Sequence, residues 1–412
     1  MKNYALIGEK LSHSLSPEIH SKLGSYNYEL CEVKKNDLEK LLSNDDISGY
    51  NITIPYKKEI INYCSSLSEV ARDTMSVNTI IKDSLGLWHG DNTDAYGFYY
   101  MINRSGVDFS DKKVLVLGSG GASLSVCYVL KKLNVREIVV ISRKGQNSYE
   151  NIERHIDCDI IVNTTPVGMY PDTLISPIDL NVFPRLSGVF DLIYNPQRTK
   201  LILDAQALNI PTGNGLSMLV AQAKKASELF QRIELDDKLI EKIICESNHK
   251  NTNIIFIGMP SCGKSYIGEI LARKLNRRFV DIDDEIEKEY SLSPSEIITN
   301  NGEEYFREIE TQVLSCFAKE KSLVIATGGG VVAKKENYQV LTQQGFIVWL
   351  KRDLKELTTS NRVLSAKYGI ARLYEERKPL YEMFSDVVVQ NDVNTDVISK
   401  IVEMYNNEDF SY

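Results

Sequence analysis

The sequence predicts an α/β protein with two parallel-sheet units, each built around its own nucleotide-binding loop. Two segments, 112–133 and 253–275, have the pattern of an apolar strand, a glycine-rich loop and a helix. Strand-like and helix-like segments alternate around both loops, which favours parallel sheets covered by helices. The 412 residues allow two or three domains of roughly 100–200 residues each.

The composition is that of an ordinary globular chain. Hydrophobic residues make up 43% and charged residues 25%, which excludes a disordered, collagen-like or coiled-coil protein. The net charge of −8, without a basic block, argues against nucleic-acid and membrane partners and leaves small-molecule substrates. The seven cysteines form no CxxC pair and the first residues lack a signal-peptide core, so we expect a cytoplasmic protein. We expect it to be a monomer or a homodimer.

The first glycine loop, GSGGAS at 118–123, has the spacing that places a pyrophosphate on a helix N-terminus. A simple tight turn is the alternative. The next strand, REIVVIS, ends beside Arg143 and Lys144, where an NAD site would carry an acidic residue. A cationic pair at this point suits a 2′-phosphate and therefore favours NADP, unless the pair forms a solvated turn.

Polar residues also occupy segments before this loop where apolar residues would be expected. These segments are LSHSLSP (11–17), YNITIPYK (50–57), SVNTI (76–80) and GDNTDAYG (90–97). Each alone is explained by a turn, a cap or a strand edge, and a lone Lys57 by a surface lysine.

Taken in order, these segments resemble the shikimate dehydrogenase family from residue 4 to about residue 230. The matching stretches are Ser14 with Ser16, Asn51–Lys57, Val77–Thr79, Gly90–Asp94, Gly118–Ala122, Asn163–Met169, Asp191–Thr199 and Gly215–Gln222. The resemblance implies an α/β substrate domain at 1–100 plus 215–240 and an NADP-binding Rossmann domain at 101–214.

The same resemblance implies roles for individual residues. Lys57 and Asp94 would form the catalytic pair, since a lysine beside a carboxylate can donate the proton that ketone reduction requires. With this pair, the substrate would contact Ser14, Ser16, Asn51, Thr53, Asn78, Tyr194 and Gln222. NADP would contact Gly118, Ser119, Gly120, Gly121, Ala122, Arg143, Asn163, Thr164 and Gly215.

The chain departs from the family at two points of the cofactor domain. The family's Asn-Arg-Thr is replaced by Ser142-Arg143-Lys144. The segment between Arg143 and Asn163 is too short for a full strand–helix–strand unit, so we expect one element to be missing or reduced.

Further along, the polar residues at 246–252 predict a break, and we assign 241–252 to a linker.

The second glycine loop, GMPSCGKS at 258–265, follows a strand and precedes a helix, as a P-loop requires. Its backbone amides would cradle phosphates, Lys264 would reach the β/γ-phosphates and Ser265 would bind Mg²⁺. The predicted ATP contacts are Pro260, Ser261, Cys262, Gly263, Lys264 and Ser265.

The segments after the P-loop resemble shikimate kinase from about 253 to 390, which implies a P-loop, NMP-kinase-like domain at 253–412. They are FVDIDDEIE (279–287), EEYFREIE (303–310), VIATGGG (324–330) and ERKPLY (376–381). By this resemblance Asp281 helps to hold Mg²⁺, and Asp283 binds substrate and acts with Lys264 in catalysis. Arg307, Gly329, Gly330 and Arg377 would clamp a carboxylate, and Arg362 would lie on a lid over ATP. The alternatives are a helix N-cap for the two aspartates and surface ion pairs for Arg307 and Arg377.

Together these observations predict a bifunctional enzyme that uses NADP(H), ATP and Mg²⁺. Its first part would reduce 3-dehydroshikimate to shikimate, and its second part would form shikimate 3-phosphate in aromatic amino-acid biosynthesis. One alternative is an NAD-using quinate/shikimate dehydrogenase fused to a kinase. The other is a non-catalytic ligand-sensing protein on the same folds.

Overall fold

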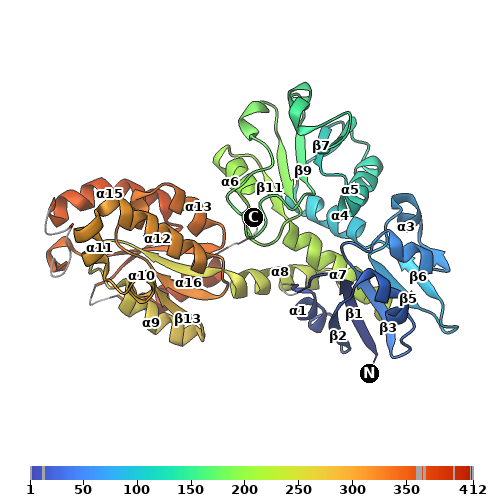
Figure 1. Ribbon diagram of the computed structural model, residues 1–412, viewed down its shortest axis with the longest axis horizontal. Coiled ribbons are helices and arrows are strands. Elements are labelled where there is room, and N and C mark those ends of the chain that lie inside the picture. The colour runs from blue at the N-terminus through green and yellow to red at the C-terminus, as the bar shows by residue number, and fades with distance from the viewer. Residues whose placement is uncertain are drawn as a thin grey trace. The chain divides into compact units, whose positions relative to one another are not determined.

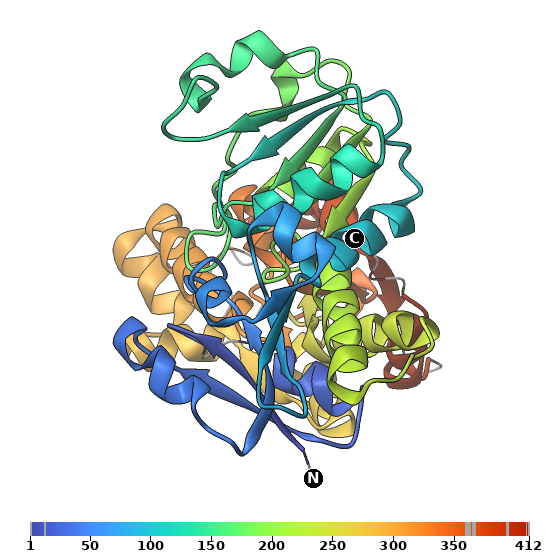
Figure 2. The same cartoon turned by 90° about the vertical axis from the view of Figure 1, so that its right-hand side faces the viewer.

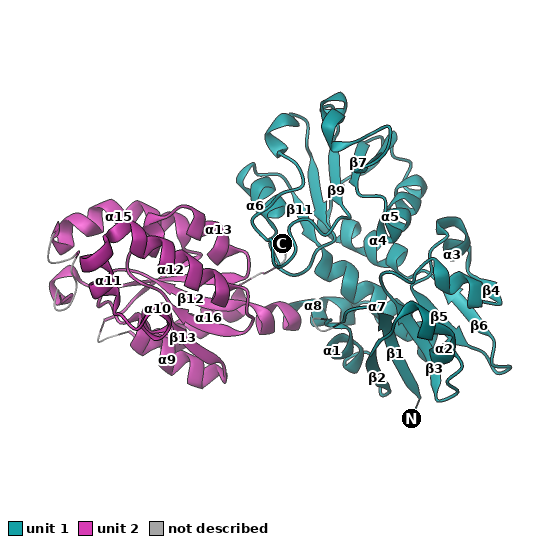
Figure 3. Cartoon of the chain, viewed as in Figure 1, with its two compact units in different colours: residues 1–245, 412 teal, residues 246–411 magenta. Residues whose placement is uncertain are grey.

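The computed structural model describes residues 2–11, 14–358, 364, 368–392, 395–408 and 410 (Figure 1). The chain divides into two compact units: unit 1 is Met1–Cys245 with Tyr412, and unit 2 is Glu246–Ser411 (Figure 3). Within the described ranges, no helix combines the length and apolar character needed to cross a membrane.

The first lobe of unit 1, residues 3–91, contains a mixed six-stranded sheet with the order β2-β1-β3-β5-β6-β4. β1 is parallel to β2 and β3, whereas β5 is antiparallel to β3 and β6. The expected parallel sheet is therefore only partly present. The β5–β6 pair is antiparallel because a tight hairpin joins the two strands, and Asp83 in its turn accepts hydrogen bonds from the amides of Leu85 and Leu87. The elements are β1 (Asn3–Gly8), α1 (Ser16–Ser21), β2 (Asn27–Glu32), α2 (Leu38–Leu42), β3 (Ile47–Ile52), β4 (Ser66–Leu67), α3 (Glu69–Thr74), β5 (Thr79–Lys82) and β6 (Trp88–Asp91), with 3-10 helices η1 (Lys35–Asp37) and η2 (Glu59–Tyr63).

The second lobe, residues 113–214, contains a parallel sheet with the order β11-β10-β9-β7-β8. Successive residues of β7 enter two different cores: Val114 packs with α5, and Leu115 packs with α6. Helices therefore cover both faces, as an all-apolar parallel strand requires. The elements are β7 (Lys113–Leu117), α5 (Gly121–Lys132), β8 (Glu137–Ile141), η3 (Tyr149–His155), β9 (Ile160–Asn163), η4 (Leu180–Val182), β10 (Gly188–Asp191), α6 (Lys200–Ala207) and β11 (Thr212–Asn214). Only the 3-10 helix η3 connects β8 to β9, in line with the short segment there.

Two paired helices, α4 (Asp94–Ser105) and α7 (Gly215–Gln231), join the two lobes of unit 1. Phe98 of α4 lies in the core of the second lobe, whereas Phe230 of α7 stacks on Tyr4 of β1 at 4.2 Å between ring centroids. Figure 2 shows the two sheets of unit 1 as separate layers, with these helices where they meet. The residues at the starts of α4 and α7 therefore lie where the lobes adjoin.

The predicted linker at 241–252 is helical. Helix α8 (Lys238–Asn251) continues through it, and the boundary between the units falls inside this helix. Ile244 packs in the core of unit 1, and Asn248 donates a hydrogen bond to the Phe410 carbonyl in unit 2. Tertiary contacts at both ends of the helix thus override the polar, breaker-rich composition.

Unit 2 is a parallel five-stranded sheet with the order β13-β14-β12-β15-β16, and helices surround it. The central strand β12 is buried along its whole length. The elements are β12 (Asn253–Ile257), α9 (Lys264–Leu275), β13 (Arg278–Asp281), α10 (Ile282–Tyr290), α11 (Pro294–Asn301), α12 (Glu303–Ala318), β14 (Leu323–Ala326), η5 (Val331–Ala333), α13 (Glu336–Thr342), β15 (Gly345–Lys351), η6 (Leu354–Glu356), α15 (Ile370–Phe384), β16 (Val387–Gln390) and α16 (Val397–Asn407). The predicted α/β fold class is confirmed.

The contact between α4 and α7 gives a stability prediction. Gly97→Ala should lower the free energy of unfolding of unit 1 by about 1–3 kcal/mol. The added Cβ would lie 2.5 Å from the Met218 carbonyl oxygen, and backbone yields little. Urea unfolding followed through Trp88 in a Trp349→Phe background isolates unit 1, because the chain has 2 tryptophans. The exposed Asn103→Ala on the same helix is the control, and equal stability of Gly97→Ala and wild type would contradict the close contact.

Candidate active sites

Lys57 and Asp94 form an ion pair in unit 1. Lys57 lies in the turn after β3, and Asp94 is the first residue of α4. The Lys57 Nζ donates a hydrogen bond to Asp94 Oδ2 at 2.6 Å, and the two side chains are 16% and 5% exposed. A carboxylate at this distance orients the ammonium group and compensates its charge.

Asn78 fixes the carboxylate of Asp94 and connects it to α7. Its Nδ2 donates hydrogen bonds to Asp94 Oδ1 and to Gln222 Oε1, both at 2.9 Å. Its Oδ1 accepts a hydrogen bond from the Thr93 amide at 2.7 Å. Asn51 Nδ2 donates to the Asn78 carbonyl at 3.4 Å. One hydrogen-bonded network thus contains the predicted site residues Lys57, Asp94, Asn78, Gln222 and Asn51.

Asn51 and Ser16 meet at Tyr28, which the sequence analysis did not single out. The Tyr28 hydroxyl donates a hydrogen bond to Asn51 Oδ1 at 2.7 Å, and Ser16 adds a side-chain hydrogen bond to the same phenol. Burial raises the pKa of Tyr28, so the phenol remains a donor. His20 stacks on its ring at 3.9 Å between centroids, and burial lowers the pKa of His20 to about 3. Tyr28 lies inside β2, where no motif marks it.

Three further predicted substrate residues form no hydrogen bond with Lys57 or Asp94 among the described residues. Ser14 accepts a hydrogen bond from the Ser16 amide at 3.2 Å. Thr53 follows β3 and is half-buried, and the half-buried Tyr194 packs against an apolar cluster of α1, α7 and α8. Among the described residues, no hydrogen bond joins the side chain of Thr53 or Tyr194 to Lys57.

The first glycine loop follows β7 and opens α5. Gly118 has φ +105°, and a Cβ there would lie 2.7 Å from the Thr164 hydroxyl. Ser119 and Gly120 are exposed, and nothing lies within 4 Å of a Cβ placed on Gly120. The backbone here is open to a ligand, at a helix N-terminus that favours an anion.

This helix N-terminus lies beside the ion pair. A Cβ on Gly121 would be 3.5 Å from the Lys57 side chain and 3.6 Å from the Ser76 hydroxyl. Ala122 is the next residue, in the first turn of α5. Ser76 Oγ is buried and has no hydrogen-bond partner among the described residues. An open glycine cradle next to a polar atom without a partner fits the phosphate-bearing cofactor that the loop predicts.

Asn163 ends β9, and a buried carboxylate holds it there. Its Nδ2 donates a hydrogen bond to Asp191 Oδ1 at 3.0 Å. Asp191 also accepts hydrogen bonds from the Ile193 amide at 3.1 Å and the Thr199 hydroxyl at 2.7 Å. Burial nevertheless raises the pKa of Asp191 to about 7. Asp191 begins the stretch Asp191–Thr199, which matches the family, but it was not predicted as a site residue. It fixes both the Asn163 turn and the loop that carries Tyr194.

Arg143 and Gly215 mark two further parts of the predicted cofactor site. Arg143 is exposed after β8. Burial raises the pKa of the Tyr149 phenol in η3, and the positive charge of Arg143 opposes this rise. Gly215 begins α7, where a Cβ would lie only 2.0 Å from the Leu192 carbonyl oxygen. Only glycine fits this close backbone approach.

The P-loop of unit 2 connects β12 to α9. Gly258, Ser261 and Gly263 have φ values of 142°, 65° and 100°, which fold the loop tightly. Lys264 is 8% exposed and its Nζ donates hydrogen bonds to the carbonyls of Gly258 and Met259, both at 3.0 Å. The lysine thus lies across the loop that would cradle phosphates.

Ser265 and Asp281 bring two oxygen donors together after the P-loop. The Ser265 hydroxyl donates to Asp281 Oδ2 at 2.5 Å, while Asp281 Oδ1 caps α10 by accepting the Asp283 amide at 3.0 Å. Asp281 is therefore an N-cap and also faces Ser265. Hydroxyl and carboxylate oxygens suit Mg²⁺. No group of three His, Cys, Asp or Glu in the described ranges could hold a metal, so phosphate and water oxygens would complete its shell.

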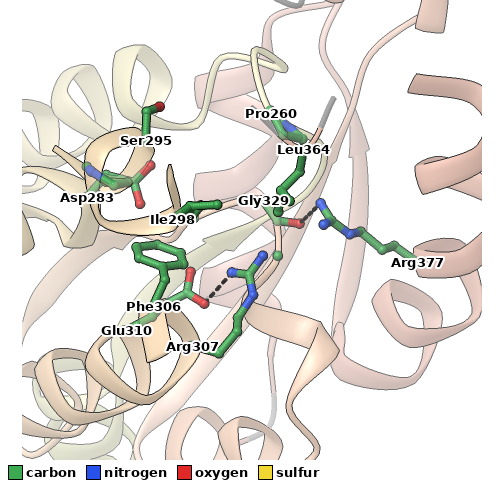
Figure 4. A pocket seen from close by; sticks show the side chains of 13 residues that line it. Pro260, Asp283, Ser295, Ile298, Phe306, Arg307, Glu310, Gly329, Leu364 and Arg377 are labelled. Atoms are coloured by element: carbon green, nitrogen blue, oxygen red, sulfur yellow. Dashed lines mark hydrogen bonds and ion pairs between the residues drawn. The ribbon is translucent and has the colours of Figure 1, made fainter. Parts of the chain in front are cut away.

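A polar pocket lies beside the P-loop (Figure 4). Arg307 is 6% exposed and its Nη1 donates to Glu310 Oε2 at 2.6 Å. Burial opposes the charge of Arg307, but the carboxylates of Glu310 and Glu303 together outweigh it, and the pKa of Arg307 is raised. Arg377 donates from Nη1 to the Gly329 carbonyl at 3.0 Å. The lining residues are Pro260, Asp283, Pro294, Ser295, Ile298, Phe306, Arg307, Glu310, Gly328, Gly329, Gly330, Leu364 and Arg377.

The three glycines of this pocket allow charged groups to approach the backbone. A Cβ on Gly330 would lie 1.9 Å from Arg307 Nη2, and a Cβ on Gly328 would lie 2.4 Å from Glu310 Oε1. Glu310 is fully buried and was not predicted as a site residue.

Of the remaining predicted ATP contacts, Ser261 and Cys262 are described by the structure and Arg362 is not. The Cys262 carbonyl accepts a hydrogen bond from Asn391 at 2.8 Å, and Ser261 pairs with the Thr358 hydroxyl at 3.1 Å. Arg362 lies outside the described residues.

Comparisons with known proteins match both parts of the chain. The family model "Shikimate dehydrogenase substrate binding domain" matches residues 6–80, and the family model "Shikimate kinase" matches residues 260–406. A shikimate dehydrogenase (NADP(+)) of Clostridium beijerinckii is 38% identical over 262 residues, covering 58% of this chain and 96% of that protein. The chain belongs to the shikimate dehydrogenase family.

Solved structures of shikimate dehydrogenases resemble the same part of the chain. That of Peptoclostridium difficile has a TM-score of 0.57 and 34% identity, covering 60% of this chain and 98% of its own. A chorismate mutase/shikimate 5-dehydrogenase fusion from Clostridium acetobutylicum has a TM-score of 0.58 and 34% identity, covering 61% and 98%. With a shikimate kinase domain at 260–406, this shikimate dehydrogenase is a bifunctional enzyme of the shikimate pathway.

The buried carboxyl of Asp191 gives a pH prediction. Its pKa is about 7 in the folded chain against an ordinary value of 3.8, so between these values only the folded state keeps the proton. The free energy of unfolding of unit 1 should therefore fall as pH rises from about 4 to 7, and Asp191→Asn should flatten that slope. Urea unfolding through Trp88 in the Trp349→Phe background, at several pH values, measures it. Asp204→Asn on α6 is the control, and an unchanged slope in Asp191→Asn would contradict the assignment.

Proposed function

We propose that residues 1–240 reduce 3-dehydroshikimate to shikimate with NADPH. Residues 253–412 then phosphorylate the 3-hydroxyl of shikimate with MgATP, and 241–252 connect the two parts. The observation that carries the first step is the Lys57–Asp94 pair, 2.6 Å apart, beside the open N-terminus of α5. A solved Thermus thermophilus shikimate dehydrogenase in complex with NADP(H) and shikimate supports it; it has a TM-score of 0.55 and 27% identity, covering 60% of this chain and 100% of its own.

In the reduction, NADPH supplies the hydride for the ketone carbon. The ketone oxygen gains negative charge as the hydride arrives and needs a proton. Lys57 donates that proton from Nζ, and Asp94 orients Nζ and compensates its charge. Asn78 keeps the carboxylate from rotating, because it holds Asp94 Oδ1 while Lys57 holds Oδ2.

In the phosphorylation, MgATP supplies the phosphoryl group. Asp283 lines the pocket and accepts the proton of the 3-hydroxyl, while Arg307 and Arg377 hold the carboxylate of shikimate. Lys264 neutralises the β/γ-phosphates once it leaves the carbonyls of Gly258 and Met259. The oxygen that the first step converts from ketone to alcohol is the nucleophile of the second step.

The cofactor preference is the point on which relatives differ. The matching C. beijerinckii protein carries NADP(+) in its name, whereas a 26% identical quinate dehydrogenase from Corynebacterium glutamicum was solved in complex with NAD. An NAD-using enzyme is therefore the second candidate. The exposed cation Arg143 after β8, where an NAD site would carry an acid, favours NADPH.

Arg143→Asp should weaken or reverse a preference of the wild type for NADPH over NADH. Charged hydrogen bonds contribute roughly 1.5–3 kcal/mol, so kcat/KM for NADPH should fall roughly ten- to a hundredfold. The measurement is kcat/KM for both cofactors in the variant and in Arg154→Asp, an exposed charge change on η3. Equal efficiency of the wild type with NADPH and NADH would refute the assignment.

Reciprocal variants test the proposed function. Lys57→Ala should lose dehydrogenase activity by ~10²–10⁴-fold, because general acid catalysis has this magnitude, and should keep kinase activity. Lys264→Ala should lose kinase activity and keep dehydrogenase activity. Supplied with dehydroshikimate, NADPH and MgATP, Lys264→Ala should oxidise NADPH and accumulate shikimate.

Each variant is the control for the other, since both replace one lysine by alanine. Loss of both activities in either variant would show that the two parts are coupled. A wild type that binds shikimate without turning it over would instead support a ligand-sensing protein.

A further inference from the structure

Tyr381 lies one helical turn after Arg377 on α15, and both side chains reach the same backbone carbonyl. The Tyr381 hydroxyl donates a hydrogen bond to the Gly329 oxygen at 2.5 Å, and Arg377 Nη1 donates to that oxygen at 3.0 Å. A carbonyl oxygen has two lone pairs, so these two donors satisfy it. Tyr381 is fully buried and is not among the residues that line the pocket.

The position of this carbonyl sets the direction of the next amide. The Gly329–Gly330 peptide is trans, so its C=O and N–H point in opposite directions. Holding the Gly329 oxygen toward α15 therefore turns the Gly330 N–H away from α15. Within the described residues, that N–H has no hydrogen-bond acceptor. A Cβ on Gly330 would touch Arg307, so the free amide and the buried guanidinium are neighbours.

We propose that Tyr381 is a positioning residue of the kinase site. It holds the Gly329 carbonyl so that the Gly330 amide and the guanidinium of Arg377 are available to the carboxylate of shikimate. The inference rests on the proposed kinase function. Arg377 Nη1 already donates to the Gly329 oxygen. Without the phenol, this guanidinium would be the only side-chain group holding that oxygen while it also binds the substrate.

The surroundings of Tyr381 hold the hydroxyl in this direction. Its ring stacks on Trp349 of β15 at 5.4 Å between centroids, with an interplanar angle of 25°. The hydroxyl also contacts the Met259 sulfur of the P-loop at 3.8 Å. Burial raises the pKa of the phenol, so it remains a donor. Tyr381→Phe retains the ring contacts and removes only the hydroxyl.

The test compares shikimate affinity and ATP affinity in the full chain. Tyr381→Phe should raise KM for shikimate roughly three- to tenfold, the range expected for one buried hydrogen bond, and leave KM for ATP within about twofold. Titration of Trp349 fluorescence in a Trp88→Phe background should give the same rise in Kd for shikimate without depending on turnover. An analogue with a hydroxymethyl group in place of the carboxylate should bind wild type and variant equally.

Tyr405→Phe is the matched control. Its phenol also donates to backbone carbonyls of unit 2, those of His249 and Thr252, and it does not line the pocket. Its KM for shikimate should be unchanged. The inference is overturned if Tyr381→Phe keeps the wild-type affinity for shikimate, or if it weakens the analogue as much as shikimate. Binding without phosphorylation in the wild type would refute the proposed function, yet the Kd comparison would still decide the role of Tyr381.

Discussion

A shielded cation held by a carboxylate at 2.6 Å is the interaction on which each site depends. Lys57 is paired with Asp94, and Arg307 is paired with Glu310, each at 2.6 Å. Neither cation is freely solvated. Loss of Asp94 would remove the carboxylate paired with Lys57, and loss of Glu310 would leave Arg307 with only the longer ion pair to Glu303, at 3.3 Å. The surrounding residues serve these pairs: Asn78 fixes Asp94, and glycine at 330 leaves room for the guanidinium of Arg307. The placement of the two carboxylates therefore fixes where these two cations lie.

Much of this arrangement was predictable because the chemistry lies at the ends of strands and at the starts of helices. Apolar strands followed by glycine loops predict where the two phosphate-binding loops lie, and the α/β fold follows from their alternation with helices. Lys57 follows β3, Asp94 begins α4 and Asn78 directly precedes β5. At such ends of elements, a motif can mark a side chain that does not contribute to the hydrophobic core. The structure joins them by hydrogen bonds, whereas their roles toward substrate stay predictions.

What the sequence could not predict are contacts made by residues inside regular elements. Tyr28 lies within a strand and Glu310 within a helix, where a buried polar residue has the same local pattern as a structural one. A break was expected at 246–252 because these residues are polar, but helix α8 continues to Asn251. Those residues are held by distant partners, as in the bond from Asn248 to the Phe410 carbonyl. The antiparallel β5 was missed because a hairpin turn and a loop can have similar composition.

The central claim is that one chain makes an alcohol from a ketone and then phosphorylates that same oxygen. The most direct measurement supplies purified protein with 3-dehydroshikimate, MgATP and NADPH carrying deuterium at the transferable position, followed by mass spectrometry of the product. The account predicts shikimate 3-phosphate with one deuterium, on the carbon that bears the phosphate. Deuterated shikimate that is never phosphorylated, or a phosphorylated product without deuterium, would contradict it.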